Sequence, residues 1–551
     1  MTSVTVYGGA GEIGGNKILV DDGGWSVLLD FGMSFKRHGM FFEEFLKPRG
    51  GRGLVDYLEL GLLPRLRGLY RTDLEPPGAA VWAQYPPVPF DRARLRGVIL
   101  SHAHLDHSAD ISFLDPAIPI FCGPVTAFLA KGVQDSGKSS MAGEVVYATD
   151  RVPYEPEKNL IEAAVNAQRV KAGLGLLKSS SSKFAARVRP FYFTAEPSGA
   201  GAEAFWQTSP GSRGVDGVAW QAASAVWKSA LRLLPVDHSI PGACACLLET
   251  SAGPLAYSGD IRLQGRAAGD TRAFAAAAAA LNGVTLLCEG TRLGKERESG
   301  TAAQIEDDRP APTEEEVAAN CLEAVQAAKG TLVVADFGPR NVERLQSFLG
   351  IAEATDRLLV VLDKDAYLLQ ALAAVGFAGA PAPDHPRLRV FNEPTTNPGA
   401  WRRDSVWAQL QDRLITARAI GDAPGDYIVC FSFFQTNDLV DIRPDGGIYI
   451  YSTSEPYDDE QKLDLKRLRE WLKHFEMTLV GDPEVKGQAR YHASGHAPEA
   501  DLRWVVETIR PKRLIPIHTE HPEWFTENFD KRHGGWCEVI EPKVGVPIPL
   551  G

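Results

Sequence analysis

The chain begins with a hydrophobic pattern that is typical of a β-meander. Apolar residues alternate over residues 4–6, a glycine-rich turn follows at residues 8–15, and apolar runs cover residues 17–21 and 25–30. Such patterns predict neighbouring strands. Because the glycine-rich turn leads into a strand and not into a helix, it does not fit a dinucleotide-binding loop. We expect its glycines to let the backbone come close to the histidine-rich turn described next.

The strongest chemical signal is a polar turn after an apolar run at residues 97–100. The run predicts a buried strand, which would deliver the turn at its carboxyl end. The turn contains His102, His104, Asp106 and His107. Neutral imidazole suits zinc, and a carboxylate beside it suits a second cation. The spacing therefore predicts two metal ions and a hydrolytic site, although a histidine-rich surface loop is the alternative.

Strand-like runs elsewhere in the chain also lie next to residues that can bind metal ions. These residues are His238, Asp260, Glu289, His496 and His518. The last two come after a stretch in which strand and helix patterns alternate, so that stretch is predicted to be a parallel α/β domain inserted into the metal-binding domain.

Helices are predicted in several segments between these landmarks. Residues 313–316 have the pattern of a capping box that opens a helix, and residues 461–475 carry apolar residues on one side. Residues 160–177 and 219–234 also look helical, and they are separated by serine-rich and glycine-rich runs. We interpret residues 135–234 as an insertion.

Composition narrows the class of protein. The chain has 551 residues, enough for two to four domains or for one domain with large insertions, and 44% of the residues are hydrophobic. It shows neither a membrane-spanning run nor a secretory signal, so we expect a cytoplasmic protein without membrane association. Seven scattered cysteines fit a reducing compartment. The net charge of −12 argues against a broad basic surface for nucleic acid, but it does not exclude a narrow basic channel.

These motifs, in this order, resemble the metallo-β-lactamase superfamily and, within it, the β-CASP nucleases, with ribonuclease J as the nearest likeness. The turn from His102 to His107 matches the superfamily signature His-x-His-x-Asp-His. The other matching motifs are His238, Asp260 in Ser-Gly-Asp, Glu289 in Cys-Glu-Gly-Thr, His496 in Ala-Ser-Gly-His-Ala, and His518 in Pro-Ile-His-Thr-Glu. The resemblance covers nearly the whole chain.

The resemblance implies an α/β fold, an αββα sandwich with an inserted β-CASP domain. Residues 1–304 would form the first part of the metallo-β-lactamase domain, with the insertion at about 135–234. Residues 305–480 would form the β-CASP domain, and residues 481–551 would complete the first domain.

The resemblance also implies two Zn²⁺ ions, with Mn²⁺ able to replace one or both. Seven residues would bind them: His102, His104 and His238 for one ion, Asp106, His107 and His518 for the other, and Asp260 as the bridge. Asp106, Glu289 and His496 would form the catalytic group, with Glu289 orienting His496 to stabilise charge or to protonate the leaving group.

Other residues are candidates for contacts with the substrate. Arg340 lies in a turn before a predicted helix, where it and the backbone amides are suited to a phosphate, and a plain helix start is the alternative. Ser452, Ser454 and Ser494 lie in turns that are rich in serine or close to His496.

The implied function is a zinc-dependent ribonuclease that hydrolyses RNA phosphodiester bonds by a two-metal mechanism, as a 5′-to-3′ exonuclease, an endonuclease, or both. The alternative is a metallo-hydrolase of the same fold that acts on DNA, including single-stranded DNA, or on a small ester. Glu289 and His496 favour nucleic acid, whereas the acidic charge balance weighs against it. An inactive scaffold would require lost ligands, and every ligand is present. The resemblance allows for a homodimer.

Overall fold

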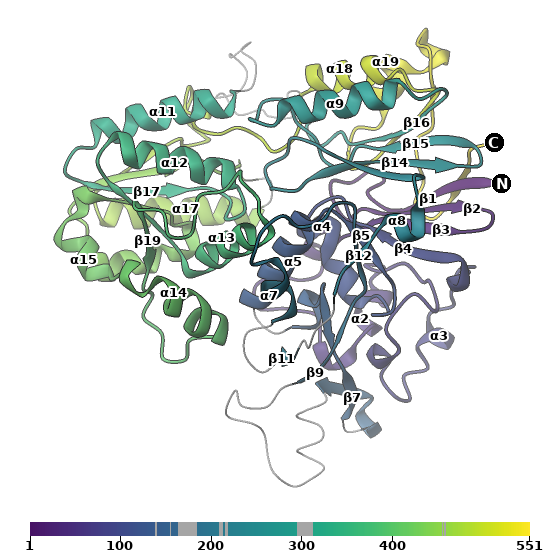
Figure 1. Cartoon of the computed structure of the whole chain (residues 1–551), viewed down its shortest axis with the longest axis horizontal. Coiled ribbons are helices and arrows are strands. Elements are labelled where there is room, and N and C mark those ends of the chain that lie inside the picture. Colours follow the sequence, from purple (N-terminus) through teal and green to yellow (C-terminus); the bar gives the residue numbers. More distant parts are fainter. Residues whose placement is uncertain are drawn as a thin grey trace.

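The computed structural model describes residues 1–137, 140–154, 156–163, 184–208, 213–214, 219–294, 312–454, 456 and 459–551. The chain forms two lobes that lie side by side (Figure 1). The lobe on the right of Figure 1 contains both termini and two large sheets, and the lobe on the left contains a third large sheet surrounded by helices.

The first sheet of the right-hand lobe begins with the predicted meander, since β1, β2 and β3 are antiparallel neighbours and β4 continues the sheet in parallel with β3. Its strands, in order across the sheet, are β12 (Gln221–Ala222), β10 (Phe191–Phe193), β5 (Ile120–Cys122), β4 (Leu95–Ile99), β3 (Ser26–Phe31), β2 (Lys17–Asp22), β1 (Thr2–Gly8) and β26 (Pro547–Pro549).

The second sheet faces the first, and the two share a core that includes Val20, Leu29, Cys246 and Leu287. Its strands, in order, are β13 (Leu231–Pro235), β14 (Cys244–Thr250), β15 (Gly253–Tyr257), β16 (Thr285–Cys288), β24 (Arg513–Pro516) and β25 (Glu538–Val539).

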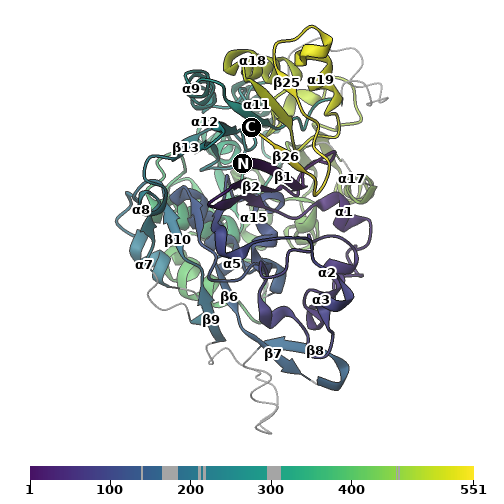
Figure 2. The same ribbon diagram turned by 90° about the vertical axis from the view of Figure 1, so that its right-hand side faces the viewer.

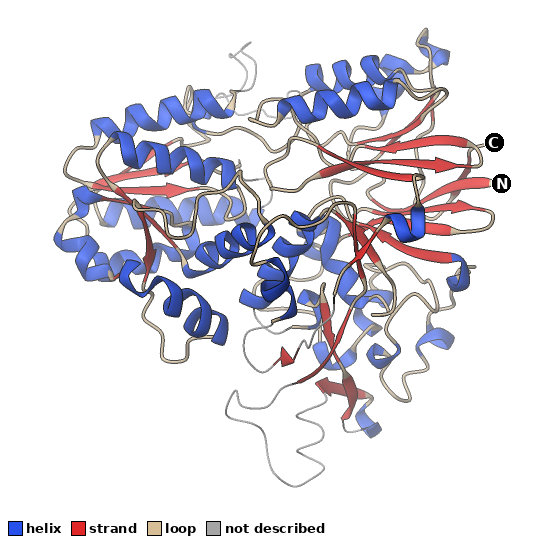
Figure 3. Ribbon diagram, viewed as in Figure 1, coloured by secondary structure: helices blue, strands red, loops and turns tan. Residues whose placement is uncertain are grey.

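Helices cover the outer faces of both sheets (Figure 3). On the second sheet these are α9 (Ala268–Ala279), α18 (Glu499–Ile509) and α19 (Glu523–Phe529). Leu28 and Val98 on the outer face of the first sheet belong to a core with Leu58 and Phe128. Those two residues lie in α2 (Val55–Glu59) and α5 (Pro124–Ser136). The predicted αββα sandwich is therefore confirmed.

The left-hand lobe is built around a sheet whose strand pairs are all parallel. Its strands, in order, are β20 (Leu414–Ile415), β19 (Leu388–Phe391), β18 (Leu358–Val361), β21 (Tyr427–Val429), β17 (Leu332–Asp336), β22 (Gly447–Tyr451) and β23 (Met477–Val480). The chain enters this lobe after β16 and returns to the second sheet at β24, so the parallel α/β unit is inserted, as predicted.

The main helices of this lobe are α11 (Glu314–Ala327), α12 (Val342–Ala354), α13 (Asp363–Val375), α15 (Ala417–Asp422) and α17 (Asp459–His474). Thr313 forms the predicted capping box with Glu316 at the start of α11. Three leucines of α17, at positions 465, 468 and 472, are buried against the sheet, as the pattern predicts.

Shorter elements complete the described structure. They are the helices α1 (Phe35–Gly39), α3 (Val81–Gln84), α4 (Leu105–Ser108), α7 (Ala202–Gln207), α8 (Ser224–Trp227), α14 (Ala408–Leu410) and α16 (Leu439–Ile442), and the strands β6 (Tyr147–Thr149), β7 (Arg151–Tyr154), β8 (Leu160–Ala163), β9 (Phe184–Val188) and β11 (Arg213–Gly214). The β7–β8 hairpin and β9 lie at the far end of the right-hand lobe (Figure 2).

The helix predicted at residues 160–177 is wrong for residues 160–163, which are the residues of this segment that the structure describes. Leu160–Ala163 is strand β8, which pairs with β7, and residues 164–177 lie outside the described part of the chain. The helix predicted at residues 219–234 is also wrong, because α8 covers only Ser224–Trp227. Lys228 ends α8 with a φ of 53°, and the following residues pair with β14. Pairing with a neighbouring strand outweighs local helix propensity here.

The segment between residues 135 and 234, predicted to be an insertion, contributes strands to both large sheets of the right-hand lobe. Its strands β10 and β12 extend the first sheet beyond β5, and β13 starts within it and belongs to the second sheet. The boundary expected between residues 304 and 305 lies outside the described residues.

The two lobes meet where α5 packs against α13. Asp135 of α5 is buried there, and its carboxylate pairs with Lys131 at 2.5 Å. It also accepts hydrogen bonds from the hydroxyls of Tyr147, at 2.6 Å, and of Tyr367 in α13, at 3.0 Å. This polar contact fixes the lobes against each other, because a buried carboxylate needs each of its partners.

Each of the seven cysteines is buried and free. In the part of the chain that the structure describes, no helix is both long enough and apolar enough to cross a bilayer.

Candidate metal centre

The histidine-rich turn begins directly after β4. His102 follows the strand, His104 caps the amino end of α4, and Asp106 and His107 lie in the first turn of that helix. Gly14, with a φ of 74°, passes so close that a Cβ atom there would lie 2.9 Å from Asp106 Oδ2. The predicted close approach of the glycine-rich turn is therefore confirmed, and it is possible only because glycine has no side chain.

Strand pairing in the second sheet brings the distant candidates to this turn. β15, β16 and β24 are parallel and in register, so their carboxyl ends lie at one edge of the sheet. Asp260, Glu289 and His518 follow these three ends. β14 runs antiparallel to β15, so the loop before β14, which holds His238, reaches the same edge.

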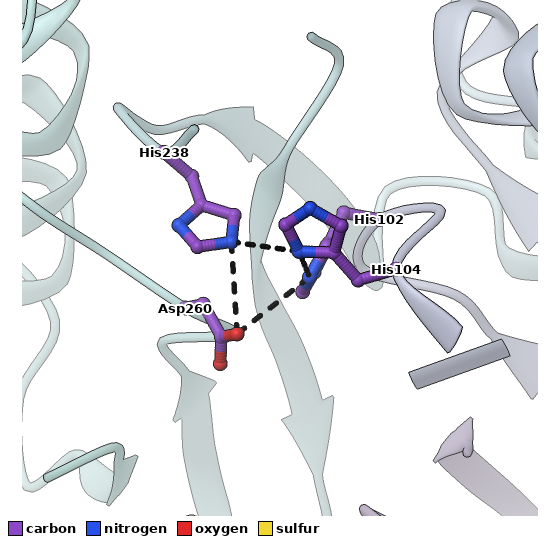
Figure 4. Close-up of side chains that lie close together, drawn as sticks. All are labelled: His102, His104, His238 and Asp260. Atoms are coloured by element: carbon purple, nitrogen blue, oxygen red, sulfur yellow. Dashed lines mark hydrogen bonds and ion pairs between the residues drawn. The ribbon is translucent and has the colours of Figure 1, made fainter. Parts of the chain in front are cut away.

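The first group of potential ligands contains His102, His104, His238 and Asp260 (Figure 4). His104 Nδ1 lies 3.2 Å from His102 Nε2 and 3.0 Å from His238 Nε2. Asp260 Oδ2 lies 3.6 Å from His102 Nε2 and 3.7 Å from His238 Nε2. These atoms surround one small space.

The imidazoles of the first group are held in their neutral form. Burial and the neighbouring His107 keep the pKa of His102 well below its ordinary value. Burial also lowers the pKa of His238 to about 4, and burial with the nearby His238 lowers the pKa of His104. Neutral imidazole is the form that coordinates a metal ion.

The second group contains Asp106, His107, His518 and again Asp260. His107 Nε2 lies 3.1 Å from Asp260 Oδ2, and His518 Nε2 lies 3.3 Å from Asp106 Oδ2. Burial alone would raise the pKa of both carboxyl groups, but the adjacent His107 and His518 rings hold it below the ordinary value. Asp260 is shared by the two groups, so it is the residue in position to bridge.

Two atoms test whether this centre fits metal ions. His107 Nε2 and Asp260 Oδ1 are both buried and make no hydrogen bond, although His107 Nε2 lies 3.1 Å from the other oxygen of Asp260. Buried polar atoms are seldom left unpaired, and both residues belong to the second group of potential ligands. Nitrogen and carboxylate oxygen are the ligands that suit zinc, so the residues fit such an ion at either group.

Asp30 supports the turn from beneath, and the sequence analysis did not single it out. It is the next-to-last residue of β3, with a φ of 54°, is fully buried, and accepts a hydrogen bond from His107 Nδ1 at 2.7 Å. The hydroxyls of Ser101, at 2.7 Å, and Tyr257, at 2.5 Å, also donate to it. This carboxylate leaves Nε2 as the free ligand atom of His107, as the outer partner of a metal-binding histidine does.

His496 lies beside the second group. Its Nδ1 atom is 3.2 Å from each carboxylate oxygen of the buried Glu289 and 4.0 Å from Asp260 Oδ2. Glu289 accepts further hydrogen bonds from the amide of Ile261, at 2.8 Å, and from the hydroxyl of Thr291, at 2.6 Å. The Glu289 carboxylate is therefore fixed, and it orients the ring of His496, which is partly exposed.

Thr291 is a second residue that the sequence analysis missed. Its hydroxyl donates to Glu289 and lies 2.8 Å from Nδ1 of His518, so it connects the His496 pair to the second group. The sequence offers one signal for it, since Thr291 follows Glu289 by two positions at the end of a buried strand.

The four candidates for substrate contact lie in different settings. Arg340 Nη1 is 3.4 Å from the carbonyl of Ala103, so it reaches the histidine-rich turn. Ser494 accepts a hydrogen bond from the amide of His496 at 3.2 Å. Ser452 is buried and donates to the carbonyl of Tyr491, whereas Ser454 is exposed.

The strand predicted before His496 is wrong. A short 3-10 turn, Ala489–Tyr491, is followed by irregular backbone up to α18. Local apolar residues suggested a strand, but this segment pairs with no neighbouring strand and is held by side chains instead.

Comparison with known proteins agrees with this architecture. Residues 482–539, which include His496 and His518, match the family described as "Zn-dependent metallo-hydrolase RNA specificity domain". Ribonuclease J of Mycolicibacterium smegmatis is 23% identical over 288 residues, which cover 51% of this chain and 45% of that protein. Ribonuclease J2 of Bacillus subtilis is 20% identical over 296 residues, which cover 52% and 45%. The chain thus spans about half the length of these two relatives.

Two further similarities extend over more of the chain. Ribonuclease J of Thermus thermophilus is 20% identical over 545 residues, which cover 95% of this chain and 70% of that protein. A solved structure of a protein of unknown function from Enterococcus faecalis has a TM-score of 0.61 and 20% identity, with 99% of both chains covered. This last similarity concerns the fold alone.

The αββα sandwich, the histidine and aspartate groups and the matched domain are together similar to those of the metallo-hydrolases of the metallo-β-lactamase superfamily. Within that superfamily, the inserted parallel α/β domain and the similarity to three ribonuclease J proteins make the chain resemble the β-CASP nucleases, and among them ribonuclease J.

Proposed function

We propose that this protein is a zinc-dependent ribonuclease that hydrolyses RNA phosphodiester bonds, as a 5′-to-3′ exonuclease, an endonuclease, or both. One observation carries the proposal: two groups of metal-binding side chains share Asp260, and the His496–Glu289 pair lies beside them. The match to an RNA specificity domain over residues 482–539 supports RNA as the substrate.

In this proposal His102, His104 and His238 would hold one ion, Asp106, His107 and His518 would hold the other, and Asp260, which belongs to both groups, would contribute to both. When bound, two such ions make water nucleophilic near neutral pH and neutralise charge on the phosphate. Mn²⁺ is able to replace one or both ions, since imidazole and carboxylate also bind it.

The protein's own residues prepare the centre for this reaction. Asp30 holds His107 and Thr291 holds His518, so the two rings keep one orientation. Such fixed ligands need little reorganisation during the reaction. Asp106 is held by the turn itself and by His518.

His496 has the position of a proton donor. Glu289 accepts a hydrogen bond from Nδ1, which leaves Nε2 free for the substrate. There His496 gives a proton to the oxygen atom that leaves phosphorus, or it stabilises the charge that grows on that oxygen. Arg340, beside the turn, has the charge and the position to bind a phosphate of the substrate.

The experiment is to incubate purified protein with RNA bearing a 5′-monophosphate or a 5′-triphosphate, with circular RNA, and with matching single-stranded DNA, in zinc or manganese. Mononucleotides from linear RNA alone would indicate an exonuclease, and cleavage of circular RNA would indicate an endonuclease. Light scattering of the same sample would test the expected homodimer.

Asp106→Asn should abolish RNA cleavage, and His496→Ala should lower its rate about 100-fold or more to a small but measurable value; both variants should keep the fold intact. His533→Ala, which changes an exposed histidine in the turn after α19, is the matched control and should keep full activity. RNA cleavage at the wild-type rate by both site variants would overturn the proposal. Cleavage of DNA, or of a small phosphate or carboxylate ester, in place of RNA would favour the alternative hydrolases.

A further inference from the structure

A buried arginine, Arg262, lies two residues after the shared ligand Asp260. Its side chain is fully buried, and its guanidinium group contacts three carboxylates. Nε donates to Asp237 at 2.9 Å, Nη1 donates to Glu314 at 2.9 Å, and Nη2 donates to Glu343. A planar group with five donors in fixed directions is suited to such a junction.

The three carboxylates belong to different parts of the molecule. Asp237 precedes the metal-binding candidate His238 in the right-hand lobe. Glu314 is the first residue of α11, and Glu343 lies in the first turn of α12, both in the left-hand lobe. Arg262 therefore joins the loop of one metal ligand to the start of two helices in the other lobe.

The same segment holds the backbone around His496. Arg262 Nη1 also donates to the carbonyl of Ser494 at 3.3 Å. The side-chain amide of Gln264 donates to that carbonyl at 3.1 Å and to the carbonyl of His496 at 3.0 Å. The amide of Ala497 donates to the carbonyl of Ile261 at 2.8 Å. Since the backbone at His496 is in neither a helix nor a strand, these bonds define where it lies.

A second arginine extends the connection. Glu314 also accepts a hydrogen bond from Arg344 Nε at 2.9 Å, and Arg344 Nη1 donates to the carbonyl of Ser452 at 2.8 Å. Glu314 is thus bound from both sides by guanidinium groups. Removing one partner from a buried network of this kind leaves uncompensated charge.

We propose that Arg262 is a positioning residue that sets His496 relative to the metal ligands, so that proton transfer to the leaving oxygen depends on its guanidinium group. This inference rests on the proposed function. Lysine would keep the charge, but its ammonium group cannot reach Asp237, Glu314 and Ser494 with the geometry of the planar fork. A small displacement of a proton donor costs a large factor in rate.

The test compares two substrates in the variant Arg262→Lys. One is RNA, whose leaving oxygen must be protonated. The other is the p-nitrophenyl ester of thymidine 5′-monophosphate, whose leaving group departs as a stable anion and does not need a proton donor. We expect kcat on RNA to fall about 30-fold or more, KM to change less than about threefold, and kcat on the ester to fall less than about threefold. The zinc content should equal that of wild-type protein.

Two further variants keep the inference testable if Arg262→Lys does not fold. Gln264→Met removes both bonds to the His496 loop without changing a charge, and it should give the same difference between the substrates. In the His496→Ala background, Arg262→Lys or Gln264→Met should add less than about a twofold loss on RNA, because the positioned group is already absent. Arg418→Lys, at a side chain that is 90% exposed, is the control and should be unchanged.

The outcomes separate the positioning role from the proposed function. Four results would overturn the role of Arg262: an equal fall of kcat on RNA and on the ester, a loss of zinc, an unchanged kcat on RNA, or fully multiplicative losses in the double variant. Wild-type protein that cleaves neither substrate would overturn the proposed function and the inference together.

Discussion

Asp30→Asn is the perturbation that tests how the histidine-rich turn is supported. Asp30 is fully buried, and its two oxygens accept hydrogen bonds from the Ser101 amide, the Ser101 hydroxyl, the Tyr257 hydroxyl and His107 Nδ1. Asparagine has the same shape, but one of its two terminal atoms is a donor and not an acceptor. In either orientation, that amide group faces donors.

The size of the loss in stability depends on which hydrogen-bond donors to Asp30 can rotate. The two hydroxyls can rotate, but neither the Ser101 amide nor the His107 ring can do so without moving the turn. At least one bond of 2.7 Å to a charged acceptor is therefore lost in each orientation. With one buried donor left unpaired, we expect the free energy of unfolding to fall by about 2–4 kcal/mol. Loss of the carboxylate behind a metal-binding histidine should weaken zinc binding about 10–100-fold.

The assay is competition for zinc between the protein and a coloured chelator, together with urea unfolding of the metal-free protein. Asp356→Asn is the matched control, since that carboxylate is 89% exposed and has a similar φ of 55°. The control should change neither quantity. If Asp30→Asn bound zinc as tightly as the control variant and unfolded at the same urea concentration, the reasoning about this support would be refuted.

Three other changes give separate predictions. Gly14→Ala should weaken zinc binding, because its Cβ atom would lie 2.9 Å from Asp106. Gly11 also has a positive φ, but a Cβ atom there would have no atom within 4 Å, so Gly11→Ala should only lower the free energy of unfolding, by about 1 kcal/mol. Competition for zinc with a chelator distinguishes the two variants. Burial raises the pKa of Asp336 to about 7, so the free energy of unfolding of the wild-type protein should fall as pH rises from about 4 to 7. Asp336→Asn removes this pH dependence. Relative to wild type, the variant should therefore be more stable by about 2–4 kcal/mol more at pH 8 than at pH 5, as measured by urea unfolding. Asp135→Asn should lower the melting temperature strongly, with a loss of about 3–5 kcal/mol, because it leaves a buried lysine one turn earlier without its counter-ion.

Much of the fold could be predicted because its signals are local. Buried strands alternate with capped helices over residues 313–480, and this pattern has few solutions other than a parallel sheet. The metal-binding candidates could be predicted for a related reason, since Asp260, Glu289 and His518 each follow a buried strand. Parallel strands bring such residues to one edge however far apart they lie in the chain.

Other features could not be predicted because they depend on contacts between distant segments. Asp30 and Arg262 look like ordinary charged residues beside strands, and only the fold shows that they are buried and what they bind. The helix predicted at residues 219–234 fails for the same reason, because the strand β14 offers Leu231–Pro235 a partner that the local sequence does not reveal. Likewise, the loop around His496 is held by side chains from residues 262 and 264 and not by a local pattern.

The central claim is that the two groups sharing Asp260 act together as a metal centre for RNA hydrolysis. The most direct measurement is the rate of RNA cleavage by chelator-treated protein as zinc is returned in known equivalents. The account predicts no cleavage without metal, and full activity only when about two equivalents have been added, one for each group of ligands. Cleavage at the full rate by metal-free protein, or none at any zinc concentration, would contradict it.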